Sequence, residues 1–310
     1  MRVVTLLPSL TEIAWALGLA DCIAAVTHEC DYPPAAREKP RLTRSLLPSG
    51  LSHREIDDAV RERVAAGLPL YELDVDFLSS LEPDLILTQA LCPVCAVSVE
   101  DVCRIARALP RAPAVVSVEP TTVREILDSI MVIGTAVGRP STARATVAAL
   151  ERRLAWIAGR VSGSPTRPRV VCLEWLDPPI VAGHWVPEMV ALAGGIDVLG
   201  QPGQPSFTVD WERVAEVSPD VLVLMPCGYD LEGTLQLAAG LLVHPAVFET
   251  PAFPSGRIWA VDASSYFSRP GPRIVRGVEI LAAILHPECC TVDGHQLAAP
   301  VRLAHSSSTR

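Results

Sequence analysis

Two short segments of the sequence carry side chains that could bind a metal. Cys92 and Cys95 form a CxxC unit directly after a predicted strand, and His28 and Cys30 follow another. One CxxC unit is a weak signal by itself, because zinc sites usually take four ligands. If the two strands are neighbours, the four side chains could converge on a soft metal, or His28 could ligate the metal of a bound macrocycle. Alternatively, the thiols are small buried core residues and His28 is a hydrogen-bonded loop residue.

Aromatic side chains collect in segments that follow predicted strands. They are Tyr32, Trp175, Trp185 and Tyr229, with Tyr266 and Phe267 close behind. Because aromatic residues make up only 5% of the chain, this distribution favours a wide, apolar, ring-shaped ligand. Packing in the core and in loops is the alternative.

Catalytic motifs are absent from the sequence, which contains no GxSxG, HExxH, Walker loop or GxGxxG. Glu174, Asp177, His184 and Glu188 are close together, but such a set is weak evidence for acid–base chemistry. The segment around His184 is instead predicted to shape a pocket. The sequence therefore predicts a binding protein with no catalytic residues and no intrinsic cofactor.

The elements that must position these residues alternate along the chain. Predicted strands cover 2–7, 22–26, 84–88, 114–118, 169–173, 221–225 and 257–261, and amphipathic patterns lie between them at 10–19, 100–108 and 123–137. Such alternation predicts an α/β fold with mostly parallel sheets.

The longest helical pattern, 141–161, begins after Pro140 and ends before a Ser-Gly-Ser-Pro segment at 162–165. A helix of this length spans about 30 Å. We interpret it as a connector, over 140–163, between lobes at 1–139 and 164–290; an ordinary crossover helix is the alternative. Residues 291–310 are predicted to form a disordered tail.

The two halves repeat one pattern. Residues 2–6 are similar to 169–173, and 81–87 to 217–223; in the second pair, a helix ends at Pro-Asp and a buried strand begins. Two lobes of one topology create a cleft beyond the carboxyl ends of their strands, where ligands of open α/β sheets bind.

Composition limits the classes of partner. The chain has 310 residues, 49% of them hydrophobic, and a formal net charge of −9. A disordered protein is excluded, and an acidic chain without basic runs argues against nucleic acid and anionic membranes. No apolar run reaches the ~18–20 residues of a membrane span. The start shows no leader pattern and nine cysteines fit a reducing compartment, so we expect a cytoplasmic protein, or a periplasmic or other extracytoplasmic one if a leader was removed.

Several motifs, in order, resemble one family. TLLPSLTE at 5–12, HECDYPP at 28–34, SLEPDLILTQ at 80–89 and YFSR at 266–269 are similar to the cobalamin- and siderophore-type substrate-binding proteins of ABC importers. The HECDYPP form is most similar to the cobalamin-binding branch, and the resemblance covers about residues 1–288. It implies two Rossmann-like α/β lobes joined by one long helix. A corrinoid, cobalamin or cobinamide, would bind in the cleft between the lobes and pass to a membrane permease.

The resemblance and the positions after strands together predict the contacts. Ligand-binding residues are Ser9, His28, Tyr32, Arg44, Gln89, Trp175, Trp185, Phe207, Tyr229, Tyr266, Phe267 and Arg269. Arg269 matches an arginine near the polar side chains of the corrinoid. Asp76 and Glu212 each precede a proline of the repeat by seven residues, and the resemblance implies that they pair with arginines of the permease. Solvated helix carboxylates are the alternative.

The chain also departs from the family pattern. Glu29, Ser45 and Gln89 stand where the cobalamin binders have aromatic residues, and extra residues around 51–71 begin with a predicted capping box, Ser52 with Glu55. The helix that this box starts would cover one side of the cleft.

Other functions are open at this point. They are a cytoplasmic corrinoid or haem carrier or sensor, and an enzyme that uses Cys92 and Cys95 to handle a metal or a corrinoid. Ferric-siderophore binding ranks lower, because Arg44 and Arg269 are among few cleft arginines.

Overall fold

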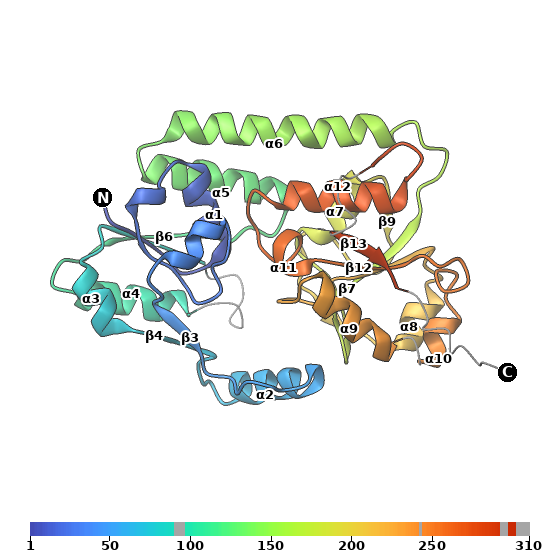
Figure 1. Ribbon diagram of the computed structural model, residues 1–310, viewed down its shortest axis with the longest axis horizontal. Helices are drawn as coiled ribbons and strands as arrows, with labels where there is room; N and C mark the ends of the chain where they lie inside the picture. The colour runs from blue at the N-terminus through green and yellow to red at the C-terminus, as the bar shows by residue number, and fades with distance from the viewer. Residues whose placement is uncertain (90–96, 242–243, 292–296, 302–310) are drawn as a thin grey trace. The chain divides into compact units, whose positions relative to one another are not determined.

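The computed structural model describes residues 1–89, 97–241, 244–291 and 297–301 (Figure 1). It divides into two compact units. The first contains Met1–Pro120, Arg124–Leu150 and Pro270–Pro272, and the second contains Thr121–Val123, Glu151–Arg269 and Arg273–Arg310. Each unit has its own sheet with parallel central strands, which confirms the predicted fold class.

The first unit is built on a parallel sheet in the order β2-β1-β5-β6. Its strands are β1 (Val3–Thr5), β2 (Ile23–Ala25), β5 (Leu85–Thr88) and β6 (Ala114–Ser117). The helices of this unit include α1 (Pro8–Ala16), α3 (Val75–Leu81), α4 (Val99–Ala108) and α5 (Val123–Ala136). Val4, Leu6 and Ile86 pack with Val102 and Ala106 of α4. Strands of a parallel sheet that helices cover in this way have continuous apolar sequences.

A two-stranded arm extends from this unit. Strands β3 (Thr43–Ser45) and β4 (Tyr71–Leu73) pair antiparallel, and α2 (His53–Ala65) lies between them in the chain. Figure 1 shows α2 away from the parallel sheet of its unit. The predicted capping box is confirmed: Ser52 Oγ accepts the N–H of Glu55, and the Glu55 carboxylate accepts the N–H of Ser52 at 2.7 Å. His53 is the buried residue of α2, so the helix contributes little to the core. The capping box therefore stabilises α2 more than core packing does.

The second unit has a larger, mixed sheet in the order β10-β8-β7-β11-β12-β13, with β9 also on β7. Its bounds are β7 (Arg169–Leu176), β8 (Pro179–Val181), β9 (Ile196–Asp197), β10 (Phe207–Thr208), β11 (Val221–Leu224), β12 (Ile258–Val261) and β13 (Ala298–Pro300). Because β13 pairs with β12, the predicted disordered tail is wrong for residues 298–300.

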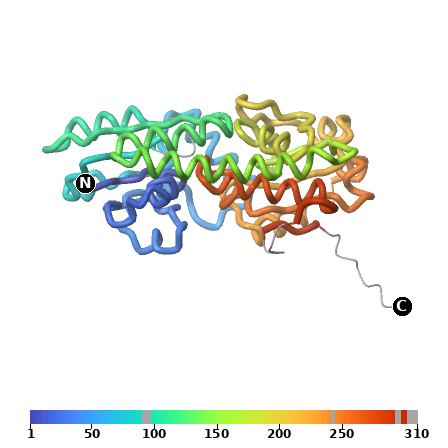
Figure 2. Tube along the Cα trace, turned by 90° about the horizontal axis from the view of Figure 1, so that it is seen from above, coloured from blue at the N-terminus to red at the C-terminus, as the bar shows by residue number. Residues whose placement is uncertain are grey.

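Helices of the second unit include α7 (Val186–Leu192), α8 (Trp211–Glu216), α9 (Leu231–Leu241), α10 (Pro245–Phe248), α11 (Ala263–Tyr266) and α12 (Ile274–Leu285). The long predicted helix is α6 (Pro140–Val161), whose residues are divided between the units after Leu150. Its second half lies beside α12, where Arg153 and Glu279 form an ion pair of 2.9 Å (Figure 2).

The central strands of the two units begin in the same way. In the first unit the Asp84 carboxylate accepts the N–H of Arg2 at 2.7 Å, and the Asp84 N–H donates to the Arg2 carbonyl at 2.9 Å. In the second unit Asp220 and Arg169 make the same two bonds, each at 2.8 Å. The sequence repeat therefore corresponds to a repeated set of hydrogen bonds.

Candidate functional site

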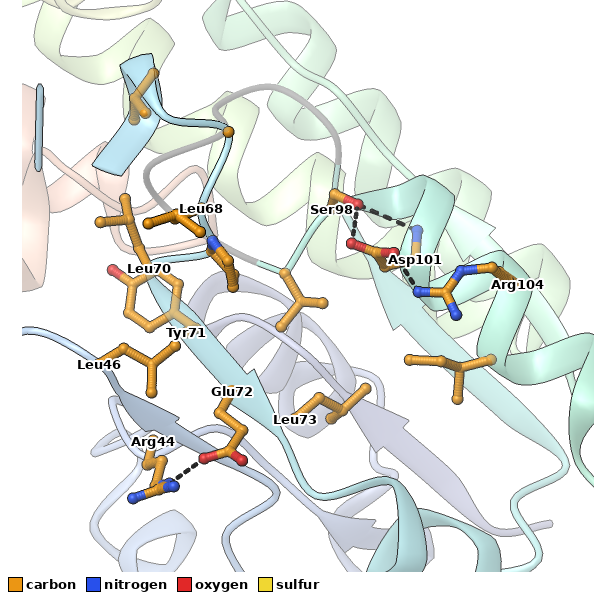
Figure 3. Close-up of a pocket in the computed structure, with 15 residues that line it drawn as sticks. Arg44, Leu46, Leu68, Leu70, Tyr71, Glu72, Leu73, Ser98, Asp101 and Arg104 are labelled. Carbon is orange, nitrogen blue, oxygen red and sulfur yellow. Dashed lines mark hydrogen bonds and ion pairs between the residues drawn. The ribbon is translucent and has the colours of Figure 1, made fainter. Parts of the chain in front are cut away.

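The first unit contains a pocket of about 690 Å³ between the arm and α4 (Figure 3). Leu46, Leu68 and Leu70 form its apolar wall, and the ring of Tyr71 lies among them. Its volume is within the range of sites that bind small molecules. The arm is an addition to the repeated α/β pattern. It supplies most of the residues that line this pocket.

Charged pairs border this pocket on both sides. Arg44 on β3 forms an ion pair with Glu72, its partner across the β3–β4 ladder. On α4, Asp101 accepts hydrogen bonds from the Ser98 hydroxyl at 2.9 Å and from Arg104 at 2.5 Å, which holds the pKa of Asp101 below its usual range. Both pairs are exposed, so each adds little stability, but together they give the pocket a polar border.

His28 is placed next to this pocket through Tyr71. The ring centroids of His28 and Tyr71 are 5.5 Å apart, and His28 Nδ1 is 2.8 Å from the Thr43 hydroxyl. Burial, and then the positive charge of Arg41, lower the pKa of His28, so the neutral imidazole is favoured. A neutral imidazole with Nδ1 engaged has Nε2 as the nitrogen that can bind a metal.

Cys30 has other partners than His28 and is not placed to bind a metal with it. Its side chain is fully buried, and its Sγ lies 3.1 Å from both the Thr11 and the Thr27 hydroxyls. His28 and Cys30 thus have different partners, while Cys92 and Cys95 lie outside the described residues. Within the described part of the chain, no group of three or more His, Cys, Asp or Glu residues could hold a metal ion.

Ser9 and Gln89 lie after β1 and β5, at the carboxyl edge of the first sheet. They are 1% and 5% exposed, and neither Ser9 Oγ nor Gln89 Oε1 has a hydrogen-bond partner among residues 1–89 or the rest of the described chain. Tyr32, in contrast, is 44% exposed. The edge therefore combines buried polar atoms with one accessible ring.

The second unit places an aromatic pair at its own carboxyl edge. Trp175 lies near the end of β7 and Tyr229 follows β11, which is the parallel neighbour of β7. Their rings meet edge to face with centroids 6.1 Å apart, and both side chains are partly exposed. The Cys227 N–H donates to the Glu174 carbonyl at 2.9 Å, which ties the segment that carries Tyr229 to β7. Rings held in this way form an apolar surface with a fixed geometry.

Glu174, which precedes Trp175 on β7, belongs to a short polar chain. The Gly183 N–H donates to Ser206 Oγ at 3.1 Å, and the Ser206 hydroxyl in turn hydrogen-bonds the Glu174 carboxyl. Burial raises the pKa of Glu174 from its ordinary value of 4.5 to about 7, although the Ser206 bond acts in the opposite direction. Next to Gly183, burial lowers the pKa of His184. Near pH 7 the Glu174 carboxyl is therefore about half protonated, whereas the His184 imidazole favours its neutral form.

Two aromatic residues predicted to bind ligand, Trp185 and Phe267, are buried. Phe267 is 2% exposed and Trp185 is 6% exposed, and the Trp185 indole N–H donates to the Phe267 carbonyl at 2.8 Å. Both rings pack in the interior of the second unit and hold α7 against the segment after α11, and their role in ligand binding stays a prediction. Phe207, on β10, is 41% exposed.

Tyr266 and Arg269 lie beyond β12, on the same side of the second sheet as Tyr229. The Arg273 guanidinium lies 5.6 Å from the centre of the Tyr266 ring, and the Ser264 N–H donates to the Tyr229 carbonyl at 3.0 Å. The segment after β12 is thus bonded to the segment after β11. Arg269 is partly buried.

Asp76 and Glu212 occupy matching places in the two units. Each is the second residue of a short helix, Asp76 of α3 and Glu212 of α8, and each is exposed. Asp76 also borders a second pocket, of about 580 Å³, lined by residues 41–44 and 72–76. The sequence repeat therefore puts one carboxylate on the surface of each unit.

Sequence reasoning missed the pocket beside the arm. Tyr71 and Glu72 belong to a strand of three residues, and Ser98, Asp101 and Arg104 read as an ordinary helix start. The pairing of Arg44 with Glu72 depends on the β3–β4 register, which no short-range signal in the sequence indicates.

Each of the two α/β units contains part of one long helix, α6. The chain belongs to the periplasmic binding protein family, whose sequence profile matches residues 3–264. This confirms the resemblance drawn from the motifs.

Relatives and solved structures agree with this assignment. The "Vitamin B12-binding protein" of Vibrio cholerae is 23% identical over 92% of this chain and 88% of its own length, and the "Cobalamin-binding protein" of Halobacterium salinarum is 26% identical over 92% and 69%. The crystal structure of the periplasmic vitamin B12-binding protein BtuF of V. cholerae matches with a TM-score of 0.65, at 23% identity over 92% of this chain and 96% of that one. A periplasmic haem-binding protein of Pseudomonas aeruginosa matches with a TM-score of 0.72, at 18% identity over 96% of both chains. Because both structural matches have low sequence identity, they show the fold alone.

None of the helices in the described ranges has the length and apolar character needed to cross a bilayer.

Proposed function

We propose that this protein binds a corrinoid, cobalamin or cobinamide, as the substrate-binding protein of an ABC importer. The observation that carries the proposal is the edge-to-face pair Trp175 and Tyr229 at the carboxyl ends of adjacent parallel strands. Relatives named for vitamin B12 and for cobalamin, each aligned over 92% of this chain, support a corrinoid as the ring-shaped ligand.

The aromatic pair supplies affinity by covering apolar surface of the macrocycle. Removal of apolar area from water is worth about 25 cal/mol per Å², so one ring that becomes buried against the ligand contributes about 1.5–3 kcal/mol. Because Trp175 and Tyr229 already contact each other, little side-chain entropy is lost on binding. The macrocycle's amide side chains find hydrogen-bonding groups at Arg269 and at backbone atoms of the same edge.

The test is a titration of the whole protein with cyanocobalamin, dicyanocobinamide and haemin, followed by calorimetry and visible absorbance. We expect micromolar or tighter binding of a corrinoid, and a loss of about tenfold or more in Trp175→Ala and in Tyr229→Ala. Trp156→Ala is the matched control, because Trp156 is 56% exposed on α6 and its ring contacts Arg160 instead. Absence of heat and of spectral change with both corrinoids would remove the proposal, and a response to haemin alone would replace the corrinoid by haem.

We further propose that His28 binds the central metal through Nε2, since Nδ1 is engaged with Thr43. His28→Ala should then shift the visible bands of the bound corrinoid. Thr43→Val, which removes the partner of Nδ1, should weaken the shift without abolishing it. Identical spectra in wild-type and His28→Ala protein would end this assignment.

The matching carboxylates support docking to a permease. Asp76 and Glu212 would each pair with an arginine of the permease, which sets orientation and association rate more than affinity. In membranes that contain the cognate importer, the double variant Asp76→Asn/Glu212→Gln should bind more slowly, while its corrinoid affinity in solution is unchanged. Equal association rates for variant and wild type would contradict the docking role.

A further inference from the structure

A pair of adjacent thiols lies directly after α12. Cys289 and Cys290 have their sulfur atoms 3.7 Å apart, although side chains of consecutive residues usually diverge. Both backbone N–H groups donate to the His286 carbonyl, at 3.1 and 2.9 Å, and the Cys289 thiol lies 3.7 Å from the same oxygen. The turn at the end of α12 therefore directs both thiols to one side.

Two long-range contacts within the second unit hold this turn: one from Arg160 on α6 and one between His286 and Gly194. Arg160 of α6 donates from Nε to the Cys289 carbonyl at 2.8 Å, and a second guanidinium nitrogen donates to the same oxygen. His286 is 1% exposed, and its Nε2 is 3.2 Å from the Gly194 carbonyl. A Cβ at Gly194 would lie 2.6 Å from that nitrogen, so the glycine is what allows the approach. The position of the two thiols is thus set before any ligand arrives.

The spacing of the sulfurs fits a shared soft atom. Two thiolates at about 2.3 Å from one centre lie roughly 3.8 Å apart if the centre is tetrahedral, and roughly 3.3 Å apart if it is pyramidal with bond angles near 90°. From the observed 3.7 Å, the two sulfurs need to approach by a few tenths of an ångström to share a pyramidal centre. Among the residues that the structure describes, no third side chain joins the pair into a metal-binding group, so a zinc site is not formed. The pair suits a thiophilic atom that needs only two sulfur ligands from the protein.

We propose that Cys289 and Cys290 form a two-thiol site for a trivalent arsenical that carries one organic group. In the reaction each thiol gives up its proton and forms one As–S bond. The double bond between arsenic and oxygen breaks, and the oxygen leaves as one water molecule with the two thiol protons. Arsenic stays trivalent and the sulfurs are not oxidised, so no oxidant or reductant is required.

Exposure sets the order of the two steps. Cys289 is partly exposed and reacts first, whereas Cys290 is 4% exposed. Burial, and then the neighbouring Cys289, raise the pKa of the Cys290 thiol to about 11. Ring closure at Cys290 is intramolecular, so the high local concentration offsets its low thiolate fraction. The second step should become faster as the pH rises.

Phenylarsine oxide is the probe, and digestion with trypsin locates it. Cleavage after Arg276 and Arg302 gives peptide 277–302, whose cysteines are Cys289 and Cys290, while Cys92 and Cys95 fall in peptide 64–104. In the folded protein, the probe should lower iodoacetamide labelling of peptide 277–302 by roughly tenfold or more, and a dithiol chelator should restore the labelling. Cys289→Ser should abolish the protection of Cys290.

Cys227→Ser, which changes an exposed single thiol, is the control and should leave the protection intact. Because neither substitution changes the backbone, wild-type circular dichroism is expected for both. The proposal fails if peptide 277–302 of the unchanged protein is alkylated at the same rate with and without the probe. It fails equally if the probe still lowers the labelling of Cys290 in the Cys289→Ser protein.

Discussion

Glu174 makes the stability of the second unit depend on pH. Its carboxyl is bonded to the Ser206 hydroxyl, and burial raises its pKa to about 7. The folded protein therefore holds a proton that the unfolded chain has already lost between pH 4.5 and 7. Stability from this group is fully present below about pH 4.5 and is lost as the pH rises through 7.

The size of the effect follows from the change in pKa. Raising the pKa from 4.5 to about 7 corresponds to about 3 kcal/mol, because each pKa unit is worth about 1.4 kcal/mol. Between pH 5 and pH 8, roughly 2–3 kcal/mol of this is lost, since the unfolded chain is already partly ionised at pH 5. Glutamine has the shape of the protonated side chain and does not ionise. Glu174→Gln should therefore gain roughly 2–3 kcal/mol over the wild type on going from pH 5 to pH 8.

Urea unfolding at the two pH values, followed by tryptophan fluorescence and far-UV circular dichroism, measures this difference. Burial also raises the pKa of Asp197, to about 6, but Asp197 is present in both proteins and its contribution cancels. Glu232→Gln, at an exposed position on α9, is the control and should follow the wild type at both pH values. Parallel stabilities of wild type and Glu174→Gln from pH 5 to pH 8 would refute the reasoning.

Three further predictions concern single contacts. Gly183→Ala should destabilise the second unit by about 3 kcal/mol or more in urea unfolding, because its Cβ would lie 2.4–2.6 Å from three backbone atoms of residues 204–206; a wild-type midpoint would contradict this. Ser52→Ala should cost α2 about 1 kcal/mol, seen as faster amide exchange in 53–65 and not in α4, since it removes the Oγ that accepts the Glu55 N–H. Trp185→Phe should cost about 1–2 kcal/mol, because the Phe267 carbonyl loses its donor; a thermal midpoint equal to that of the wild type would show that the bond carries no weight.

The elements that sequence reasoning located are those with strong local signals. The parallel strands are apolar runs next to helical patterns, and Pro-Asp marks the start of β5 and β11. Strands β3, β4, β8, β9 and β10 were not predicted, because they have two or three residues and are fixed by pairing rather than by periodicity. The helix α2 was found despite its exposed surface, because its capping box is readable from Ser52 and Glu55 alone.

For the site, residue type and place after a strand predict a region, and this stays a prediction; they do not predict the direction of each side chain. Trp175 and Trp185 have the same residue type and both follow or end a strand, yet one joins the partly exposed pair with Tyr229 and the other fills the core. The difference comes from the turn at Gly183 and His184, where the His184 N–H donates to the Gln204 carbonyl at 2.6 Å. This turn directs Trp185 inward, towards Phe267, and a pattern of residue types does not encode such a contact.

The two units share the hydrogen bonds that fix their central strands, but different residue types lie at the carboxyl edges of their sheets. Asp84 and Asp220 fix the central strands by the same hydrogen bonds, so their carboxyl edges are equivalent positions for a ligand. The edge of the first unit carries buried polar atoms of Ser9 and Gln89, and the edge of the second carries the rings of Trp175 and Tyr229. Neutral hydrogen-bonding groups such as those at the edge of the first unit suit amide groups of a ligand better than carboxylates, because carboxylates demand cationic partners. A titration that compares cobinamide with a corrinoid whose amides are hydrolysed to acids therefore probes this chemistry, with the amide form expected to bind more tightly.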